Sequence, residues 1–475
     1  MRKELNSQGG NNRTTQFLRN IGIYAIGSVG SRVITFLLVP IYSFFIAPED
    51  FGYYDLCLST VLFVLPLISM DLREGAFRFL LDTDNEDERR RIVTMSMATL
   101  LLNSLICVAL GVLAQLLLDI KYLWYTIAFA ISFSIYDVAA QMLRALGYSK
   151  LFAATGILCS FCIFLVSVPL VAFAKMGVEG IFIGNILARI AALAVMEWRV
   201  KLFSCYLRVR ADLKEIWQKV MRFSLPLVVV NLIINGITLN NRYMISQYLG
   251  FGDNGQYAVA VKFAAILDAL VLIFNQSWQE TAIKQYADAD RDEFYSKILN
   301  TYIWVLVAAV IGISYGARLM YGYIVGAEYQ ESVWLVYPLV MSTMFLSLAI
   351  FYDMGYQCSK QTGRQLPCLL IALALSVLSN YLFIRWWGLP GAICSNCATF
   401  LFMLVYKMID TRKYMKLRIS HQSLLVFALL FISMAAYYVL RDNLFALVYL
   451  LFAMIVMVVC CPVGLRQSVL KKFIR

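Results

Sequence analysis

Long apolar runs alternate with short polar segments along the whole chain. The runs are about 20 to 28 residues long, which matches the roughly 20 residues that a helix needs to cross a hydrocarbon core about 30 Å thick. They are too long and too numerous for the strands of a membrane barrel. The pattern therefore predicts an all-α, polytopic membrane protein.

Charged and turn-forming residues divide the apolar runs into about fourteen predicted transmembrane helices. The first six cover residues 20 to 46, 52 to 80, 92 to 118, 122 to 147, 151 to 174 and 178 to 198. The next six cover residues 223 to 249, 255 to 283, 298 to 325, 332 to 356, 365 to 387 and 390 to 409. The last two cover residues 421 to 440 and 443 to 462.

The lysines and arginines indicate the orientation of these helices. With a cytoplasmic N-terminus, 32 of the 41 lie in the inside segments and only 5 in the outside loops. Cytoplasmic loops of membrane proteins are enriched in these residues, so the bias favours an even number of helices and two cytoplasmic termini. The first apolar run lacks a small-residue cleavage pattern, so we expect a retained helix rather than a signal peptide.

Composition excludes several other classes of protein. Of the 475 residues, 61% are hydrophobic and 15% charged, with a mean hydropathy of +0.73, which is too apolar for a soluble protein of this size. The net charge is +12, but the basic residues lie in short loops that contain no aromatic-basic nucleic-acid-binding module, so no nucleic-acid partner is expected.

Cysteine usage gives no sign of a disulfide framework or a metal site. The 11 cysteines are odd in number and lie mostly in apolar runs. Two CxxC pairs, Cys159/Cys162 and Cys394/Cys397, have helical spacing inside apolar segments, and His421 is the single histidine. We therefore predict no metal and no cofactor.

A weak internal repeat relates two halves of six helices each. Three pairs of motifs recur at offsets of 211, 210 and 203 residues. They are Gly177-x-x-Gly180 with Asn185 and Gly388-x-x-Gly391 with Asn396, then Ser149-Lys150 and Ser359-Lys360, then Phe51-Gly52-x-Tyr54 and Asn254-Gly255-x-Tyr257. The repeat predicts an N-terminal lobe over residues 1 to 220, a C-terminal lobe over 221 to 410, and two additional helices with a basic cytoplasmic tail over 411 to 475. Parallel-repeat transporters bind substrate between such halves.

Several motifs resemble those of polysaccharide-unit exporters, the Wzx-type flippases, over roughly residues 15 to 410. In the first half they are Arg19-Asn20, Val39-Pro40, Ile46-Ala47-Pro48-Glu49-Asp50-Phe51-Gly52-x-Tyr54, Ala76-x-Arg78-Phe79 and Arg144-Ala145-Leu146-Gly147-Tyr148-Ser149-Lys150. In the second half they are Ser224-Leu225-Pro226, Asn241-Arg242-Tyr243, Tyr248-Leu249-Gly250, and Asn380 before Gly388-x-x-Gly391-Ala392.

The resemblance implies membership of the multidrug/oligosaccharidyl-lipid/polysaccharide (MOP) flippase superfamily, with two six-helix lobes of MATE/MOP-like fold that work by alternating access. It implies a substrate of undecaprenyl diphosphate carrying an oligosaccharide, moved across the bacterial inner membrane for O-antigen, capsule or other surface polysaccharide. Membrane lipids, a polysaccharide polymerase and a chain-length regulator would be its partners.

The four cations that are assigned to neither inside nor outside segments, and that we place within helices, are Arg32, Arg189, Arg242 and Lys262. Each would cost about 2.5 to 3.5 kcal/mol at the centre of a lipid-facing helix, so most should face a wet or paired interior. A diphosphate head group is a natural counter-charge, and we expect these residues, Arg32 and Lys262 above all, to bind it. Pairing with acids such as Asp137 or Asp268, or snorkelling to an interface, is the alternative.

Polar stripes on two helices are further candidates. Asn231, Asn235, Thr238 and Arg242 recur every three or four residues, so they share one helix face that could bind sugar hydroxyls or bond to other helices. Ser134, Asp137, Gln141 and Arg144 form a similar row, which we interpret as a gate or a structural feature. Asp268 and Glu280 are candidates for proton or sodium coupling, although an ion pair explains them equally well.

Prolines inside predicted spans, including Pro66 and Pro338, predict kinks whose freed carbonyls neighbouring helices can satisfy.

Two rival functions remain open at this point. A cation-coupled drug exporter or a lipid II exporter would share the fold, but a drug exporter should carry acids in its cavity, where Arg32 and Lys262 are expected here. An integral-membrane polymerase or ligase would need a catalytic constellation and a substantial outside loop, and neither is visible. The sequence therefore predicts a transporter and no enzyme.

Overall fold

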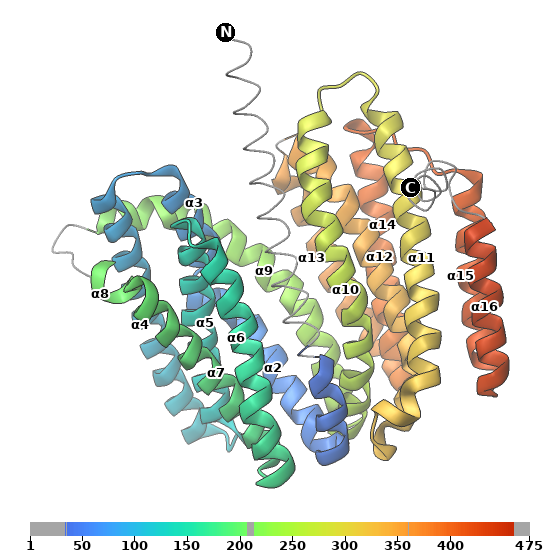
Figure 1. The fold of residues 1–475 in the computed structure, drawn as a ribbon, viewed down its shortest axis with the longest axis horizontal. Coiled ribbons are helices and arrows are strands. Elements are labelled where there is room, and N and C mark those ends of the chain that lie inside the picture. Colours follow the sequence, from blue (N-terminus) through green and yellow to red (C-terminus); the bar gives the residue numbers. More distant parts are fainter. Residues whose placement is uncertain (1–33, 35, 207–212, 360, 460–475) are drawn as a thin grey trace, which may run out of the picture. The chain divides into compact units, whose positions relative to one another are not determined.

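The computed structural model describes residues 34, 36–206, 213–359 and 361–459, and these are helical throughout apart from short connections (Figure 1). Within the described residues, twelve helices are long and apolar enough to cross a membrane, and two shorter apolar helices cover Phe36–Phe45 and Asn443–Val458. The predicted all-α, membrane-spanning architecture is confirmed. The predicted first helix lies mostly outside the described residues.

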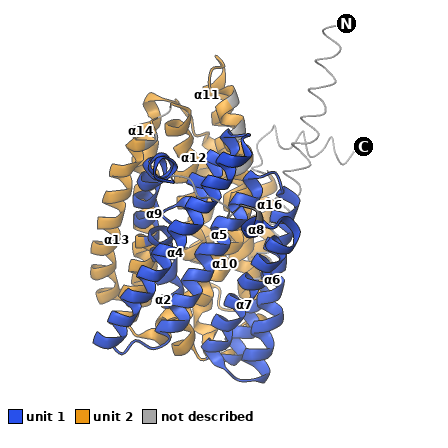
Figure 2. Ribbon diagram, turned by 90° about the vertical axis from the view of Figure 1, so that its left-hand side faces the viewer, with its two compact units in different colours: residues 1–46, 57–235 blue, residues 47–56, 236–475 orange. Residues whose placement is uncertain are grey.

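The chain forms two compact units that exchange short segments (Figure 2). Unit 1 comprises residues 1–46 and 57–235, and unit 2 comprises residues 47–56 and 236–475. The boundaries therefore fall inside two helices, α2 (Pro48–Ser69) and α9 (Lys214–Tyr248). The lobe boundary at residue 220, inferred from the repeat, stays a prediction.

Unit 1 is a bundle built from the helices between these two exchange points. They are α3 (Leu72–Asp82), α4 (Glu86–Leu117), α5 (Leu123–Ala145), α6 (Ser149–Val168) with a π-helical turn at Pro169–Phe173, α7 (Gly177–Val200) and α8 (Leu202–Tyr206). α7 packs against α5 and α6, and α3 packs against α5. The start of α9 completes the core, because Val220 and Met221 are buried among Leu72, Ala76 and Val138.

A break separates α2 from α3 where the sequence predicts one helix over residues 52 to 80. Met70 and Asp71 adopt left-handed backbone conformations, with φ of 49° and 47°. Such conformations are unfavourable for residues other than glycine, and asparagine and aspartate adopt them most readily. The Asp71 carboxylate is held by the Asn231 amide of α9, whose Nδ2 donates to both carboxylate oxygens at 3.0 and 3.1 Å. A contact with a helix 160 residues away thus fixes the bend.

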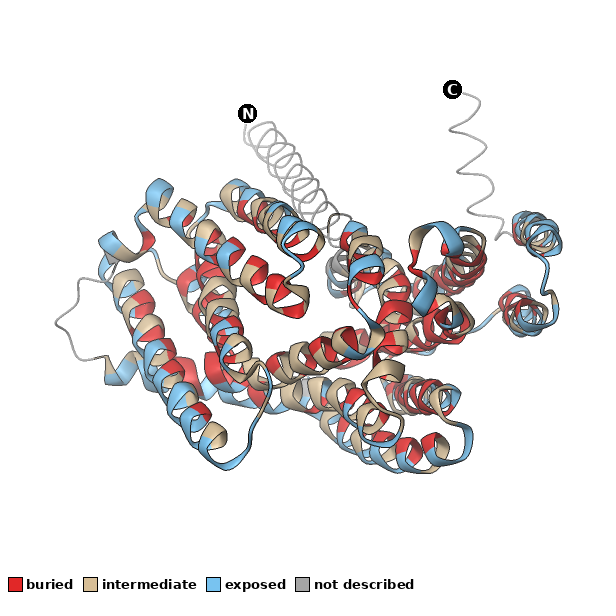
Figure 3. Ribbon diagram, turned by 90° about the horizontal axis from the view of Figure 1, so that it is seen from below, coloured by how far each residue is buried: buried red, intermediate tan, exposed pale blue. Residues whose placement is uncertain are grey.

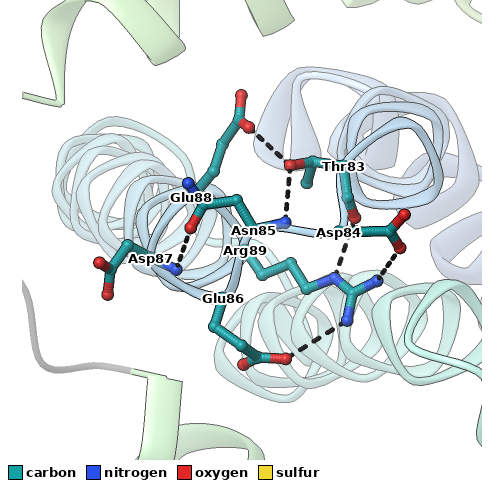
Figure 4. Close-up of polar contacts among 7 residues, drawn as sticks. All are labelled: Thr83, Asp84, Asn85, Glu86, Asp87, Glu88 and Arg89. Carbon is teal, nitrogen blue, oxygen red and sulfur yellow. Dashed lines mark hydrogen bonds and ion pairs between the residues drawn. The ribbon is translucent and has the colours of Figure 1, made fainter.

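A polar loop sets the start of α4 (Figure 4). The Asn85 side chain accepts from the Asp87 N–H at 2.9 Å, which satisfies one of the free amides of the first turn. Arg89 donates from Nε to the Thr83 carbonyl at 3.0 Å and pairs with Asp84 and Glu86. The helix therefore begins at Glu86, six residues before the predicted apolar span at 92.

Unit 2 contains the remaining helices and centres on α12. The helices are α10 (Phe251–Gln285), α11 (Arg291–Ile324), α12 (Val333–Cys358), α13 (Gln365–Trp387), α14 (Leu389–Asp410), α15 (His421–Val439) and α16 (Asn443–Val459). Short 3-10 turns at Ala327–Ser332, Thr362–Arg364 and Thr411–Lys413 connect some of them. α12 packs against α10, α11 and α14, and 72% of its apolar window is buried, the largest share among the candidate spans.

Side-chain hydrogen bonds to backbone carbonyls fasten α15 and α16 to α11 and α12. Tyr315 of α11 donates to the Ser433 carbonyl at 2.9 Å, and Arg318 donates to the Tyr437 carbonyl at 2.6 Å, near the end of α15. Trp304 of α11 donates to the Met457 carbonyl of α16 at 2.7 Å. The last two helices are therefore an integral part of unit 2.

Two prolines inside helices have the carbonyl that they free bonded by another helix. Proline lacks an N–H, so the carbonyl four residues earlier loses its helical partner. For Pro66 this is the Leu62 carbonyl, which accepts from Asn235 Nδ2 at 2.9 Å. For Pro338 it is the Trp334 carbonyl, which accepts from the Tyr438 hydroxyl at 2.8 Å. This confirms that neighbouring helices satisfy these carbonyls.

Both units have many exposed helical residues (Figure 3). Many of these exposed residues are large and apolar, as a lipid-exposed surface requires. Along α4, six leucines are each at least 59% exposed, namely Leu101, Leu102, Leu105, Leu110, Leu116 and Leu117. A soluble monomer seldom exposes so large an apolar face.

Candidate functional site

Unit 2 holds a buried ion pair between the first turns of α2 and the end of α9. Arg242 Nε lies 2.8 Å from Asp55 Oδ2, and the two side chains are 11% and 4% exposed. Arg242 also donates to the Thr238 carbonyl at 3.2 Å, and its guanidinium lies over the Tyr257 ring, 5.4 Å from the centroid. An arginine inside an apolar helix is thus neutralised and stacked, as its cost in a membrane demands.

A chain of buried amides surrounds this ion pair and links α9, α10, α13 and α14. Asn380 Nδ2 donates to Asn241 Oδ1 at 2.5 Å, and Asn241 Nδ2 donates to Asn396 Oδ1. Asn396 Nδ2 then donates to the Tyr257 hydroxyl at 2.7 Å. The three asparagines are 0% to 6% exposed. A buried network whose members are bonded in sequence specifies one arrangement of these four helices.

Lys262 lies on α10, five residues beyond Tyr257, beside the ion pair. Its side chain is half-buried, and Asp55 and Arg242 are close enough for their charges to act on it. Among the described residues it makes no hydrogen bond or ion pair. Asp55, Arg242 and Lys262 together carry one carboxylate and two cations, so this part of unit 2 has an excess of positive charge.

The first turns of α2 lie against α10 in very close contact. A Cβ at Gly52 would stand 1.8 Å from the Phe251 carbonyl oxygen, and one at Gly255 would stand 2.0 Å from the Pro48 carbonyl oxygen. Asn254 Nδ2 donates to the Gly52 carbonyl at 2.7 Å, and the rings of Tyr53 and Phe251 meet edge-on at 4.9 Å. Gly52 and Gly255 are equivalent positions of the motif that recurs at offset 203. The two copies of this motif therefore form the two faces of the contact between α2 and α10.

In unit 1, Arg189 of α7 is buried and held by its own helix and by aromatic rings. It donates from Nη1 to the Asn185 carbonyl at 2.7 Å and to the Asn185 side-chain oxygen at 3.1 Å. The guanidinium lies 4.7 Å from the Phe129 ring centroid and 4.5 Å from that of Phe133.

Two members of the polar row of α5, Asp137 and Arg144, contact side chains of α3 within unit 1. Asp137 pairs with Arg73 of α3, with Nη1 and Oδ2 3.6 Å apart, and Gln141 is buried. The Arg144 guanidinium lies over the Phe77 ring at 4.9 Å.

The stripe on α9 divides between the two units. Asn231 and Asn235 bond to Asp71 and to the Leu62 carbonyl within unit 1, whereas Thr238 and Arg242 belong to unit 2. The two amides therefore act as interhelical contacts in this structure. Asp268 of α10 is exposed. Arg32 and the Glu280 side chain lie outside the described residues.

The N-terminal half of the sequence matches a known protein family. Residues 17–279, more than half of the chain, match the model of the family described as "Polysaccharide biosynthesis protein". The chain belongs to this family. None of the curated proteins matches the sequence significantly.

Solved structures with the same fold extend over most of this family member. An inward closed structure of the lipid II flippase MurJ is 13% identical, covers 94% of this chain and 99% of its own, and superposes with a TM-score of 0.73. An inward-facing multidrug resistance MATE transporter of the MOP superfamily is 13% identical, covers 82% of this chain and 98% of its own, with a TM-score of 0.67. A MOP superfamily transporter from Pyrococcus furiosus is 13% identical, covers 83% and 96%, with a TM-score of 0.57.

The chain therefore has the fold of the MOP superfamily transporters, as its motifs predict. Family and fold together make it a multi-pass membrane protein of the polysaccharide biosynthesis protein family with the fold of these transporters.

Two charged pairs of this family member were missed from its sequence. Asp55 interrupts an apolar run directly after Phe51-Gly52-x-Tyr54, and that interruption could have identified it. Asp353 and Lys407 form a second buried pair between α12 and α14, with Nζ and Oδ1 2.7 Å apart. Asp353 and Lys407 each lie near the end of a predicted span, where charged residues are common, so neither residue indicates a buried ion pair from the sequence.

Proposed function

We propose that this protein is a flippase that moves an undecaprenyl-diphosphate-linked oligosaccharide across the bacterial inner membrane by alternating access. The observation that carries the proposal is the position of Lys262, a cation in an apolar helix beside the Asp55–Arg242 pair and without a bond to a described residue. Such an ammonium group needs an anionic partner, and a diphosphate is the anion that a lipid-linked sugar provides.

The family and one structural relative support a lipid-linked substrate. The family description names polysaccharide biosynthesis, and the relative that covers 94% of this chain is named a lipid II flippase. The excess of positive charge around Arg242 and Lys262 would repel the cationic substrates of a multidrug exporter.

In this proposal, Arg32, Arg189 and Arg242 join Lys262 in binding the head group, and Asn231, Asn235 and Thr238 contact sugar hydroxyls. Asp268 and Glu280 serve proton or sodium coupling, and Asp137, Gln141 and Arg144 act as a gate. Both termini are cytoplasmic, and a polysaccharide polymerase takes up the product on the other side. These roles remain predictions from the sequence.

The first prediction tests the function through the side of the membrane on which intermediates accumulate. Deleting the gene should stop surface polysaccharide, with lipid-linked repeat units retained on the cytoplasmic face. Lys262→Ala should reproduce this defect at normal protein levels, whereas Lys262→Arg, which keeps the cation, should retain most export. Sidedness is measured by the access of an impermeant sugar-oxidising or glycan-cleaving reagent to the intermediate in intact spheroplasts.

Accumulation on the periplasmic face would show that a step after translocation fails, and would overturn the proposal in favour of a polymerase. Full export by Lys262→Ala would remove Lys262 from the binding site. An exposed lysine paired on the surface, Lys413 with Asp410 at 2.6 Å, offers the matched control, because Lys413→Ala should export normally.

A further inference from the structure

The docking of residues 47–56 onto unit 2 combines contacts of two kinds. One kind is steric: the Gly52 and Gly255 crossing leaves no room for a side chain, and Asn254 bonds the Gly52 carbonyl. The other kind is electrostatic, since Asp55 pairs with the buried Arg242. We call residues 47–56 the α2 clasp.

The electrostatic contact can be displaced by an anion, whereas the steric contact cannot. Asp55 supplies one negative charge to a place where Arg242 and Lys262 supply two positive ones. A diphosphate carries more negative charge than a carboxylate, and guanidinium groups bind phosphate oxygens bidentately. An anionic head group at Lys262 therefore competes with Asp55 for Arg242.

We propose that Asp55 is a resident counter-ion that the substrate's diphosphate replaces at Arg242, and that this exchange releases the α2 clasp from α9. The inference rests on the proposed function, because it takes the diphosphate as ligand. It adds a coupling step: binding of the anion and undocking of the clasp are one event. Without ligand, Asp55 keeps Arg242 neutralised and the clasp docked.

The chain continues from the clasp into unit 1 at Cys57 within the same helix, α2. A change in how the first turns dock is therefore transmitted along a continuous helix into the other unit. Binding of the ligand would therefore also drive a conformational change of α2.

Hydrogen exchange of the purified full-length chain in detergent tests this inference, with undecaprenyl diphosphate as probe. At saturating probe, amide exchange in residues 47–56 of the wild type should rise about tenfold. Asp55→Asn should show raised exchange without probe and little further change with it. Glu49→Gln, which removes an exposed acid from the same segment, is the control and should behave as wild type.

A second variant guards against a general loss of folding. Gly52→Ala places a Cβ against the Phe251 carbonyl and so undocks the clasp sterically while Asp55 is kept. It should raise exchange in residues 47–56 and leave exchange in α12 unchanged. Exchange that rises across α12 in either variant would show global destabilisation and overturn the assignment of the clasp as a separable element.

The outcomes separate this inference from the proposed function. If the probe raises the melting temperature but leaves exchange in residues 47–56 unchanged, the ligand binds and the clasp inference fails. If the probe alters neither quantity, the diphosphate site itself fails, and the proposed function with it. If basal exchange of Asp55→Asn equals that of the wild type, Asp55 does not hold the clasp.

Discussion

Lys407 and Asp353 are buried charges of unit 2 that satisfy each other, in contrast with Lys262. Lys407 Nζ lies 2.7 Å from Asp353 Oδ1, and the two side chains are 2% and 14% exposed. Removing one member of such a pair leaves an uncompensated buried charge, which costs about 3 to 5 kcal/mol.

The pair therefore gives a prediction about stability. Lys407→Met should destabilise the protein by about 3 to 5 kcal/mol, and adding Asp353→Leu should restore most of the loss, because an apolar pair of similar volume replaces the ions well. The melting temperature in detergent measures both changes. Lys262→Met, by contrast, should abolish export while the melting temperature is kept. An equal loss of stability in the double variant would mean that the charge pairing is not what Lys407 contributes.

Single residues also show where prediction from sequence ends. The spacing of Asn231, Asn235 and Arg242 predicts that they share a helix face, and the structure agrees that they share α9. Their partners were out of reach, because Asp55 lies 187 residues from Arg242 and Asp71 lies 160 from Asn231. Periodicity reports the local helix and contains no information about which distant polar group a side chain meets.

At the scale of helices, Asn235 of α9 and Pro66 of α2 are linked within unit 1 through one backbone carbonyl. The proline frees the Leu62 carbonyl, and the amide of Asn235 bonds it from α9 at 2.9 Å. An unsatisfied carbonyl in an apolar interior is unfavourable, so the two positions should depend on each other.

A double-mutant cycle tests this dependence. Asn235→Leu alone should destabilise the protein by about 1 kcal/mol, as measured for interhelical hydrogen bonds in membranes. In a Pro66→Ala background the same change should cost less, because the new N–H at position 66 can bond the Leu62 carbonyl within α2. Melting temperatures of the four proteins give the coupling. Additive losses would contradict it.

Hydropathy predicted the helices themselves well, and the reason is physical. A bilayer fixes the length of an apolar run, so twelve of the predicted spans correspond to membrane-length helices among the described residues, and most of their extents follow from the hydropathy pattern. The break at Met70 and Asp71 did not follow, because the bend depends on a contact with the distant Asn231, which hydropathy does not report. The early starts of α4 and α9 also lie in polar sequence, where hydropathy is uninformative.

At the scale of the molecule, each compact unit needs a segment from beyond its main stretch of chain. Unit 1 needs the first part of α9, where Val220 and Met221 complete its core and Ser224 packs against Gly75. Unit 2 needs the α2 clasp. The internal repeat predicts two related halves, but a repeat alone does not show that segments are exchanged.

This exchange predicts how fragments behave. A fragment of residues 1 to 220 ends before Asn231 and should be degraded, because it lacks the partner of Asp71 and much of the α9 packing. A fragment of residues 1 to 248 contains these groups and should accumulate to a several-fold higher level. Immunoblots of membranes with an N-terminal tag compare the two. Equal levels would show that unit 1 folds without α9.

The Asp55–Arg242 pair also sets an order of events during synthesis. The two residues are 187 positions apart, and chains grow at about 5 to 20 residues per second, so Asp55 emerges roughly 10 to 40 seconds before Arg242. Throughout that interval the Asp55–Arg242 contact cannot form. The first turns of α2 therefore reach their final packing only after α9 and α10 have been synthesised, long after the rest of α2 has left the ribosome.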